Sequence, residues 1–283
     1  MLKSKGMPIR LIAIDLDGTL INSRTEISQA NRAALEAAAA LGIEILITTG
    51  RRFHSAQPLL ASLECPLTLV ASNGALVATM QGDILRRDFL PKAIALEVLE
   101  TTADFRPYAV AIFDVPGQGQ ILMQSNALPT GPLSWYLRTA PDRLLQVDDL
   151  PAALPNDPIQ LMFGGTPAML EPLEHLIRSS PAADRIHVTW TKYLDREISL
   201  LDVMNRGCSK ASALRWWLDQ KGLEPAEAMA IGDNFNDLEM LQLVGRPVVM
   251  ANAAAGLNQD GWHTTLSHDE DGVATAIHKF ALT

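Results

Sequence analysis

The chain has 283 residues, of which 48% are hydrophobic and 19% charged, a composition typical of a globular protein long enough for about two domains. Its formal charge of −9 argues against nucleic acid or an anionic membrane as a main partner, although one bound cation and one lysine can still attract a phosphorylated substrate. Two cysteines are too few for a disulfide framework, no segment is apolar for long enough to cross a membrane, and the polar opening leaves no room for a signal peptide. We therefore expect a cytoplasmic protein.

The first predicted element is a short apolar strand that ends in two carboxylates. Residues 11–14 have the sequence LIAI, typical of a buried strand in a parallel sheet, and Asp15, Asp17 and Gly18 follow. Because the strand gives way to a glycine turn, both acids can reach one pocket at the carboxyl end of the sheet, where such sheets bind ligands. Two acids held close together favour a divalent cation or a shared proton. Taken alone, a DxD is more often a strand end with a solvated turn, so the rest of the chain must decide between the two interpretations.

Helices and strands then alternate along the chain. Ser28 is placed to cap the first helix and Gly42 to stop it, while Pro58 predicts that the second helix starts late or is kinked. The alternation predicts a doubly wound parallel sheet whose strands end in polar turns at one edge. The predicted elements are helix 29–41, strand 43–48, helix 53–64 and strand 67–72.

The pattern changes after a predicted hairpin turn at residues 81–83. The next elements are helix 91–103, strands 108–114 and 120–124 around a turn at Pro116-Gly117, a helix near 133–145, strand 159–163, helix 167–179, and strands 186–191 and 196–201 separated by a charged turn. This order predicts an antiparallel sheet with helices packed on one face. We interpret it as a separate α+β domain of residues 87–199, inserted into a core formed by residues 1–86 and 200–283.

The first pattern returns near residue 209. Helix 209–220 carries Leu214, Trp217 and Leu218 on one stripe. The remaining predicted elements are strand 228–231, helix 237–243, strand 247–250, a short strand 263–266 and helix 271–280. The predicted fold class is therefore α/β: a doubly wound, Rossmann-like parallel sheet core with an inserted α+β cap domain.

Polar residues that suit phosphoryl transfer gather at the predicted carboxyl edge of the core sheet. Lys210 lies at a helix start, where the helix dipole disfavours a cation, and GDNFND at 232–237 packs two acids and two amides after a strand. Oxygen ligands suit Mg²⁺, a carboxylate can attack phosphorus to give an aspartyl-phosphate, and a second carboxyl group can serve as acid and base. The candidates at this edge are Asp15, Asp17, Thr49, Asn73, Lys210, Asp233, Asn234, Asn236 and Asp237.

These motifs resemble those of the haloacid dehalogenase superfamily, and specifically its Cof-type phosphatases of subclass IIB, which carry an α/β cap between motifs II and III. The matching motifs extend over nearly the whole core and follow one another in the same order as in the family. The cap resembles the family only in its pattern of helices and strands. Ala251 and Ala211 depart from the usual residues beside two of the motifs. The matching segments are DLDGTL at 15–20, TGR at 49–51, SNGA at 72–75, SKASAL at 209–214, GDNFNDLEML at 232–241, VVMANA at 248–253 and DEDGV at 269–273.

The resemblance implies a role for each matched residue. Asp15 is the expected nucleophile and Asp17 the general acid and base, and an acid at this second position favours hydrolysis. Thr49 and Lys210 are expected to hold the phosphoryl group. Further expected substrate or phosphate contacts are the backbone N–H groups of Leu16 and Gly50, together with Arg51, Asn73 and Asn236.

The same resemblance implies one Mg²⁺ ion. Its expected ligands are the carboxylate of Asp15, the backbone carbonyl of Asp17 and the carboxylate of Asp233. Asp237 is expected to stabilise the metal site by contacting these ligands, without a direct bond to the ion. Asn236 is expected to orient the phosphate or Lys210.

The favoured function is a Mg²⁺-dependent phosphatase that hydrolyses a small phosphorylated metabolite, with sugar phosphates as the preferred class, through an aspartyl-phosphate. Two alternatives remain: a phosphosugar mutase of the same superfamily, and a non-enzymatic phospho-acceptor such as a receiver domain, which the chain length and the inserted domain disfavour. Specificity is expected to come from the cap, where Arg138, Trp190 and Lys192 are candidates that the sequence alone cannot orient.

Overall fold

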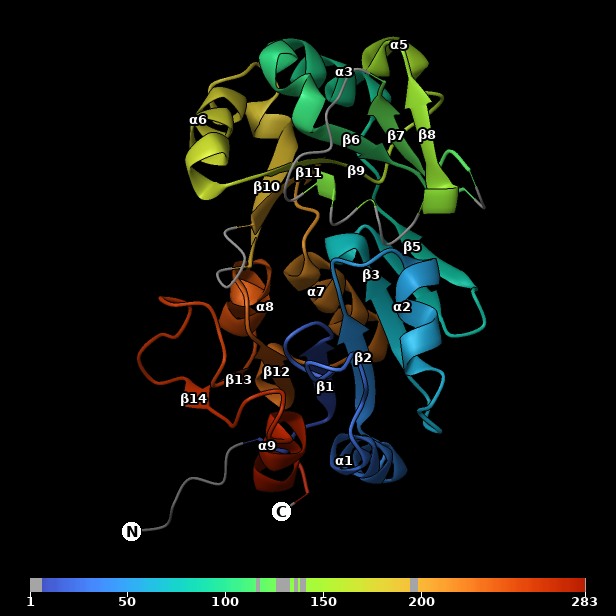
Figure 1. Cartoon of the computed structure of the whole chain (residues 1–283). Helices are drawn as coiled ribbons and strands as arrows, with labels where there is room; N and C mark the ends of the chain where they lie inside the picture. The colour runs from blue at the N-terminus through green and yellow to red at the C-terminus, as the bar shows by residue number, and fades with distance from the viewer. Residues whose placement is uncertain are drawn as a thin grey trace. The chain divides into compact units, whose positions relative to one another are not determined.

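The computed structural model describes residues 7–115, 118–125, 133–134, 137, 141–193 and 198–282. The chain divides into two compact units (Figure 1). We call Met1–Arg87 with Ser209–Thr283 the core unit and Asp88–Cys208 the inserted unit. Each unit has its own sheet and its own buried apolar cluster.

The core unit is built on an eight-stranded sheet that confirms the predicted parallel arrangement. β1 lies between β12 and β2 and is completely buried from Leu11 to Ile14, as its apolar sequence predicts. The six strands from β14 to β3 run parallel, and β4 and β5 extend the sheet antiparallel. In spatial order the strands are β14 (His263–Thr264), β13 (Arg246–Val249), β12 (Ala228–Gly232), β1 (Leu11–Asp15), β2 (Glu44–Thr48), β3 (Thr68–Ala71), β4 (Leu76–Thr79) and β5 (Ile84–Arg87).

The antiparallel extension was not predicted in full. The turn around Gly82 is confirmed, since Thr79 N–H donates to the Asp83 carbonyl at 3.0 Å, but the strands on either side of it, β4 and β5, were not predicted. Ala71 pairs with Leu76, so the chain reverses direction within the four residues between them. The apolar run at 75–78 ahead of the Gly82 turn was the signal for this hairpin.

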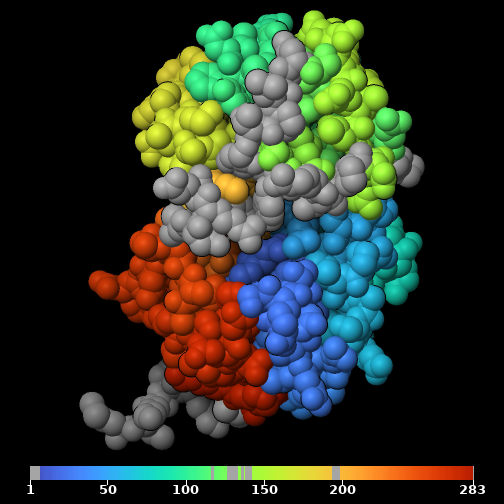
Figure 2. Space-filling model, viewed as in Figure 1, coloured from blue at the N-terminus to red at the C-terminus, as the bar shows by residue number. Residues whose placement is uncertain are grey.

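Five helices of the described core residues pack against this sheet. Ser28 caps α1 as predicted, because its side chain accepts a hydrogen bond from Asn31 N–H. Of the two effects predicted for Pro58, the late start of α2 is wrong, because the helix begins at Phe53. It contains Pro58 and ends at Leu60, before the predicted end at residue 64. Figures 1 and 2 show α1 and α9 side by side. The helices are α1 (Gln29–Ala40), α2 (Phe53–Leu60), α7 (Lys210–Lys221), α8 (Leu238–Leu243) and α9 (Gly272–Phe280), with short 3₁₀ turns η1 (Ser72–Gly74), η6 (Pro225–Glu227) and η7 (Phe235–Asp237).

The inserted unit is a six-stranded sheet with an apolar cluster between the sheet and its helices. Alternate residues of β9 and β11, including Leu161, Phe163 and Leu201, pack in this cluster with Leu170 and Leu173 of α6. The strands in spatial order are β10 (Ile186–Tyr193), β11 (Ile198–Asn205), β9 (Gln160–Gly165), β6 (Ala109–Ile112), β7 (Ile121–Gln124) and β8 (Leu144–Val147). The helical elements are α3 (Lys92–Thr101), η2 (Ala103–Tyr108), η3 (Pro141–Arg143), α5 (Leu150–Ala153), α6 (Pro167–Arg178) and η4 (Ala183–Arg185).

Three features of the inserted unit differ from prediction. The helix predicted near 133–145 is wrong at its end, because Leu144–Val147 is β8, which pairs parallel with β7 in an otherwise antiparallel sheet. Pairing with β7 there outweighs the helical preference of two leucines. α5 was not predicted. The chain returns to the core unit at Ser209 rather than 200, because β11 pairs with β10 as far as Asn205.

Some predictions fall outside the described residues. These are the turn at Pro116-Gly117, part of the helix near 133–145, the turn between β10 and β11, and Arg138. No helix in the described ranges is both long and apolar enough to cross a membrane.

Candidate active site

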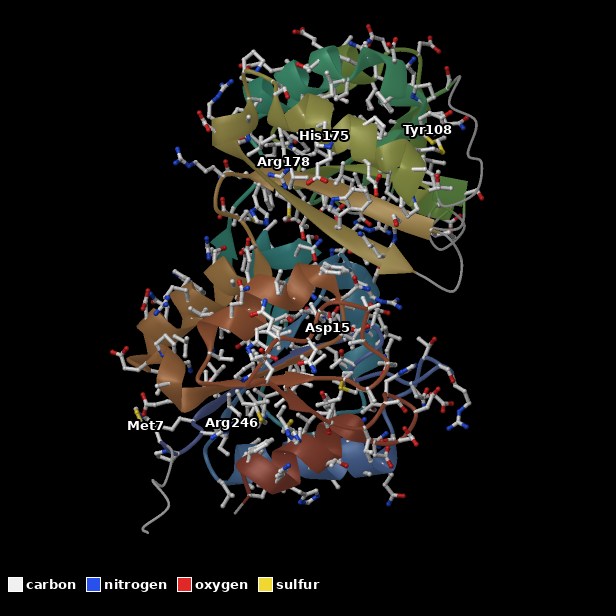
Figure 3. The ribbon with its side chains drawn as sticks, turned by 90° about the vertical axis from the view of Figure 1, so that its left-hand side faces the viewer. Met7, Asp15, Tyr108, His175, Arg178 and Arg246 are labelled. Carbon is white, nitrogen blue, oxygen red and sulfur yellow. The ribbon has the colours of Figure 1, made fainter. Side chains whose placement is uncertain are left out.

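The topology of the core sheet brings the predicted site residues to one edge. Asp15 is the last residue of β1 and pairs in register with Thr48 at the end of β2. Ile14 pairs with Ile231 of β12, so Asp233 follows β12 at the same level. Figure 3 shows Asp15 in the interior of the core unit. Parallel pairing therefore aligns the ends of these strands, as the alternation of strands and helices predicted.

The loop after β1 folds back closely on Asp233. Leu20 N–H donates to the Asp15 carbonyl at 3.2 Å, and the Thr19 hydroxyl donates to Asp233 Oδ1 at 2.9 Å. Gly18 has a φ of +78°, and a Cβ at this position would lie 2.5 Å from Asp233 Oδ2. Glycine is therefore required twice here, by the backbone conformation and by the space that Asp233 occupies.

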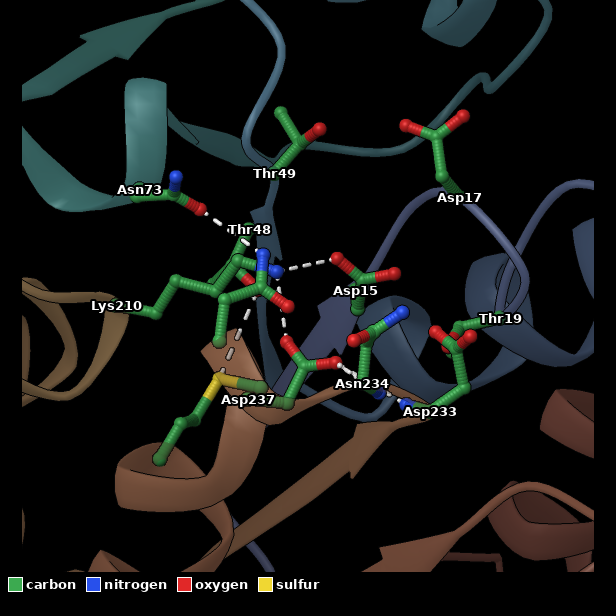
Figure 4. A network of polar contacts seen from close by, with 12 residues as sticks. Asp15, Asp17, Thr19, Thr48, Thr49, Asn73, Lys210, Asp233, Asn234 and Asp237 are labelled. Atoms are coloured by element: carbon green, nitrogen blue, oxygen red, sulfur yellow. Dashed lines mark hydrogen bonds and ion pairs between the residues drawn. The ribbon is translucent and has the colours of Figure 1, made fainter. Parts of the chain in front are cut away.

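Lys210 forms a buried ionic contact with two carboxylates (Figure 4). It is the first residue of α7, and its ammonium donates to Asp15 Oδ1 and, at 2.7 Å, to Asp237 Oδ1. The side chain of Lys210 is completely buried. The Ser209 side chain accepts from Ser212 N–H and fixes the start of the helix. A well-capped helix thus delivers a cation to the nucleophile candidate despite the unfavourable dipole.

Asp237 has both carboxylate oxygens engaged by the protein. Oδ1 accepts from Lys210, and Oδ2 accepts from the backbone N–H groups of Asp233 and Asn234, each at 3.1 Å. A Cβ at Gly232 would lie 2.7 Å from this side chain, so the end of β12 packs directly against it. Asp237 therefore fixes both the ammonium of Lys210 and the backbone that carries Asp233.

Burial and mutual repulsion dominate the electrostatics of the site. Burial raises the pKa of Asp15 well above its usual value, Asp237 and Asp233 raise it further, and Lys210 opposes them. Burial, followed by the charge of Asp237, raises the pKa of Asp233 to about 7. Burial alone would lower the pKa of Lys210, but the carboxylates of Asp15 and Asp237 outweigh it and raise that pKa. The lysine is therefore charged, and the carboxylates outnumber it.

This donor set fits a hard divalent cation. Asp15, Asp233 and Asp237 each offer an oxygen, and these oxygens lie within 4.8 Å of one another. Three buried carboxylates facing one ammonium leave negative charge that a cation would neutralise. Since both oxygens of Asp237 are already hydrogen-bonded, Asp15 and Asp233 are the side chains best placed to be metal ligands. Oxygen ligands of this kind are typical of Mg²⁺ sites.

Asp17 lies apart from this cluster and is paired with Arg51. Arg51 Nε donates to Asp17 Oδ2 at 2.7 Å and Nη2 donates to Oδ1 at 2.6 Å, which is the geometry of a bidentate pair. About a third of each side chain is exposed, 35% for Arg51 and 37% for Asp17. Arg51 N–H also donates to Thr49 Oγ1 at 3.0 Å. Arg51 thus connects the two residues expected to handle the leaving group and the phosphoryl group.

Asn73 and Asn236 contact each other. Asn236 Nδ2 donates to Asn73 Oδ1 at 3.0 Å, and Asn73 is buried. A Cβ at Gly50 would lie 3.2 Å from Asn73 Oδ1. These three residues, from three separate loops, are therefore neighbours at the same edge of the sheet.

Two site residues were missed by the sequence reasoning. Thr19 hydrogen-bonds Asp233, and Asn252 Nδ2 donates to the Gly18 carbonyl at 2.8 Å while its Oδ1 accepts from His268 N–H at 2.9 Å. Both lie inside or beside segments that the motif comparison had already singled out. Residue type and spacing did not distinguish them from ordinary turn residues.

The candidates of the inserted unit have structural contacts there. Trp190 Nε1 donates to Glu174 Oε2 at 2.8 Å, and its ring packs against the apolar cluster. Lys192 Nζ lies 5.1 Å from the centre of the same ring. Trp190 is therefore engaged with α6 of its own unit.

Comparison with known proteins agrees with this geometry. The family described as haloacid dehalogenase-like hydrolase matches residues 12–277. Phosphatase YwpJ of Bacillus subtilis is 28% identical over 94% of this chain and 98% of its own length, and the HMP-PP phosphatase of Serratia proteamaculans is 32% identical over 86% and 84%. The crystal structure of a haloacid dehalogenase-like hydrolase from Bacteroides thetaiotaomicron superposes with a TM-score of 0.76 at 26% identity, covering 96% of this chain and 99% of that one. The predicted family and fold are confirmed.

Proposed function

This chain belongs to the haloacid dehalogenase-like hydrolases, and from that premise we propose that it is a Mg²⁺-dependent phosphatase that acts through an aspartyl-phosphate. The observation that carries the proposal is the buried contact of Lys210 with Asp15 and Asp237, next to Asp233. A structural ion pair does not need surplus buried carboxylates, which destabilise the fold. Relatives named as phosphatases support the same reaction class.

Asp15 is the nucleophile in this proposal. One of its carboxylate oxygens forms a bond to phosphorus as the bond between phosphorus and the leaving oxygen breaks, and the carboxyl group of Asp17 gives that oxygen a proton. In the second step water attacks the same phosphorus, its proton passes to the carboxylate of Asp17, and Asp15 is regenerated as inorganic phosphate leaves. The proton balance closes over the two steps.

The remaining residues hold the phosphoryl group. Lys210 is charged and already touches Asp15, so it can neutralise a phosphoryl oxygen there. The hydroxyl of Thr49 accepts from Arg51 N–H, which leaves its own proton available to the phosphoryl group. The backbone N–H groups of Leu16 and Gly50 are the other proposed donors, and Arg51 is proposed to contact the substrate.

Mg²⁺ is the proposed cofactor, held by Asp15, Asp233 and the backbone carbonyl of Asp17, with Asp237 supporting Asp233 through the backbone. When bound, the ion supplies positive charge that offsets the negative charge of the phosphoryl group.

The proposed substrate is a small phosphorylated metabolite, with sugar phosphates as the favoured class. In this proposal the inserted unit is the domain that selects the organic part of the substrate. We also propose a cytoplasmic location, in keeping with the low cysteine content.

The test is phosphate release from a panel of phosphorylated metabolites, with Mg²⁺ and again with EDTA, using Asp15→Asn as the matched control. Metal-dependent release that the variant lacks supports the proposal. Release by the variant contradicts the role of Asp15. An isomerised sugar phosphate without free phosphate would identify a mutase, and a stable aspartyl-phosphate without turnover would identify a phospho-acceptor.

A further inference from the structure

Three consecutive residues between β3 and β4 have positive φ angles. Ser72, Asn73 and Gly74 have φ values of 49°, 53° and 107°, and we call them the 72–74 turn. Glycine adopts this region freely and asparagine enters it more readily than most residues, whereas serine is strained there. Such strain persists only where the surroundings fix the backbone, and it is concentrated at functional sites.

The backbone of the turn is tied to the segment that carries Thr49. Ser72 N–H donates to the Arg51 carbonyl and Asn73 N–H donates to the Thr49 carbonyl, both at 2.9 Å. Their partners run in the opposite order to the parallel register of β2 and β3, so these bonds attach the turn to the loop after β2 and are not part of the ladder. The unusual backbone therefore sets the position of Thr49 and Arg51.

The turn also packs against the start of α7. A Cβ at Gly74 would lie 2.2 Å from the Ser209 carbonyl oxygen and 3.2 Å from the Lys210 nitrogen. Only a glycine at this point lets the backbone of Lys210 come so close. The turn thus supports the helix end that delivers the ammonium to Asp15.

The side chain of Asn73 reaches the loop after β12. Asn73 is 2% exposed, and its Oδ1 accepts from Asn236 Nδ2 at 3.0 Å. Asn236 lies between Asp233 and Asp237, the two acids that follow β12. The carboxamide of Asn73 contacts this loop and its backbone N–H contacts Thr49, while the next residue, Gly74, packs against the backbone of Lys210.

We propose that Asn73 is a positioning residue that holds Thr49, Lys210 and Asn236 in one arrangement around the phosphoryl site. The sequence placed Asn73 among the phosphate contacts, but its carboxamide oxygen is a hydrogen-bond acceptor already used by Asn236. Its effect on the reaction passes through the three residues it connects. This inference rests on the proposed phosphatase function.

The experiment is a double-mutant cycle between Asn73→Gly and Asn236→Ala. Glycine allows the positive φ and removes the side chain with its carboxamide. Ser72→Gly is the matched control in the same turn, because the Ser72 hydroxyl has no hydrogen-bond partner among the described residues. We expect Asn73→Gly to lower kcat by about tenfold or more, as loss of an orienting contact does, with little change in KM. The double variant should be no slower than the slower single variant.

Two kinetic results would overturn the proposal. A rise in KM with kcat unchanged would make Asn73 a direct substrate contact, and effects that multiply in the double variant would show that Asn73 does not act through Asn236. If Asn73→Gly fails to fold, Asn73→Asp is the second variant, since it keeps the acceptor oxygen and tolerates positive φ. It should retain coupling to Asn236, and loss of that coupling would equally overturn the inference.

Binding of inorganic phosphate separates this inference from the proposed function. In the presence of Mg²⁺, phosphate should raise the melting temperature of Asn73→Gly as much as that of the wild-type protein, because the variant keeps the proposed phosphate contacts. A smaller shift in Asn73→Gly would contradict the positioning role and make Asn73 a direct phosphate contact. If the wild-type protein releases no phosphate from any substrate, the phosphatase proposal fails, while the comparison of phosphate binding still decides the role of Asn73.

Discussion

Two ionic contacts, one in each unit, differ in their burial and in their balance of charge. In the core unit Lys210 is fully buried against Asp15 and Asp237, with Asp233 close by. In the inserted unit Arg185 makes a bidentate contact with Glu97, and each side chain is about 40% exposed, at 42% and 39%. The first contact has more carboxylates than cations, whereas the second is one to one.

The difference separates a reactive site from an ordinary surface pair. Water screens the Glu97–Arg185 pair, so it adds little to stability and carries no excess charge. The buried cluster cannot be screened, and its surplus carboxylates are retained at a cost in stability. That cost is consistent with selection for binding a cation and a phosphoryl group, because stability alone would favour fewer acids.

Asp15→Asn should give the largest effect, because it removes the proposed nucleophile. Phosphate release should fall by about 10⁴-fold or more, as for other catalytic residues that act as a unit. Without metal, the same change should stabilise the fold by about 1 kcal/mol, since it removes one of the mutually repelling buried acids. Urea unfolding in EDTA measures the second effect. A variant that is inactive and also less stable would contradict the electrostatic account.

Lys210→Met tests the opposite partner of the cluster. Removing the ammonium leaves buried carboxylates without their cation, which should destabilise the metal-free protein by about 3–5 kcal/mol. Arg185→Met, the matched change at the surface pair, should have a far smaller effect. Urea unfolding of both variants makes the comparison. A loss in Lys210→Met no larger than in Arg185→Met would show that burial does not distinguish the two contacts.

The core unit was predicted more completely than the inserted unit, for a physical reason. Strands such as Leu11–Asp15 are uniformly apolar and end in motif residues, so local sequence determines both their type and their position at the sheet edge. β8 has no such signal, because Leu144–Val147 becomes a strand only by pairing with β7. The local propensity of a segment does not indicate whether another part of the chain will pair with it as a strand.

The candidate site was also predicted only in part. The candidate residues for the chemistry followed from residue type and motif, whereas the contacts between them did not. Nothing in the sequence shows that Arg51 pairs with Asp17 or that Asn252 holds the Gly18 carbonyl. Such contacts depend on loop backbones, such as the 72–74 turn, whose positive φ angle at Ser72 is unusual for serine.

The stability of the metal-free protein should depend on pH because of the buried cluster, with an effect smaller than that of the two substitutions above. The pKa of Asp233 is raised to about 7 in the folded protein, above its usual value of 3.8. The folded state therefore binds the proton more tightly than the unfolded state, and the stability from this group is lost as the pH rises through about 7. In EDTA the melting temperature of the wild-type protein should fall between pH 5 and pH 8, and that of Asp233→Asn should fall less.

The affinity for Mg²⁺ should rise with pH, whereas the stability of the metal-free protein should fall. Because the ion displaces the proton of Asp233, its affinity should weaken by up to about tenfold for each pH unit below 7. Calorimetry at pH 6 and pH 8 measures this. An affinity independent of pH would exclude Asp233 as a ligand that must first lose a proton.

Glu97→Gln should give the smallest effect and completes the comparison from the surface side. The hydrogen bond and the charge of Arg185 lower the pKa of Glu97 below its usual value of 4.5, so any stability from the pair is present above that pH and is lost as the pH falls through the lowered pKa. Wild type and variant should therefore differ only slightly at pH 7 and converge near pH 3. Because exposed pairs are screened, 0.5 M NaCl should remove the difference at pH 7. A large, salt-resistant loss would mean that the Glu97–Arg185 pair behaves as a buried contact, and that exposure alone does not separate the two ionic contacts.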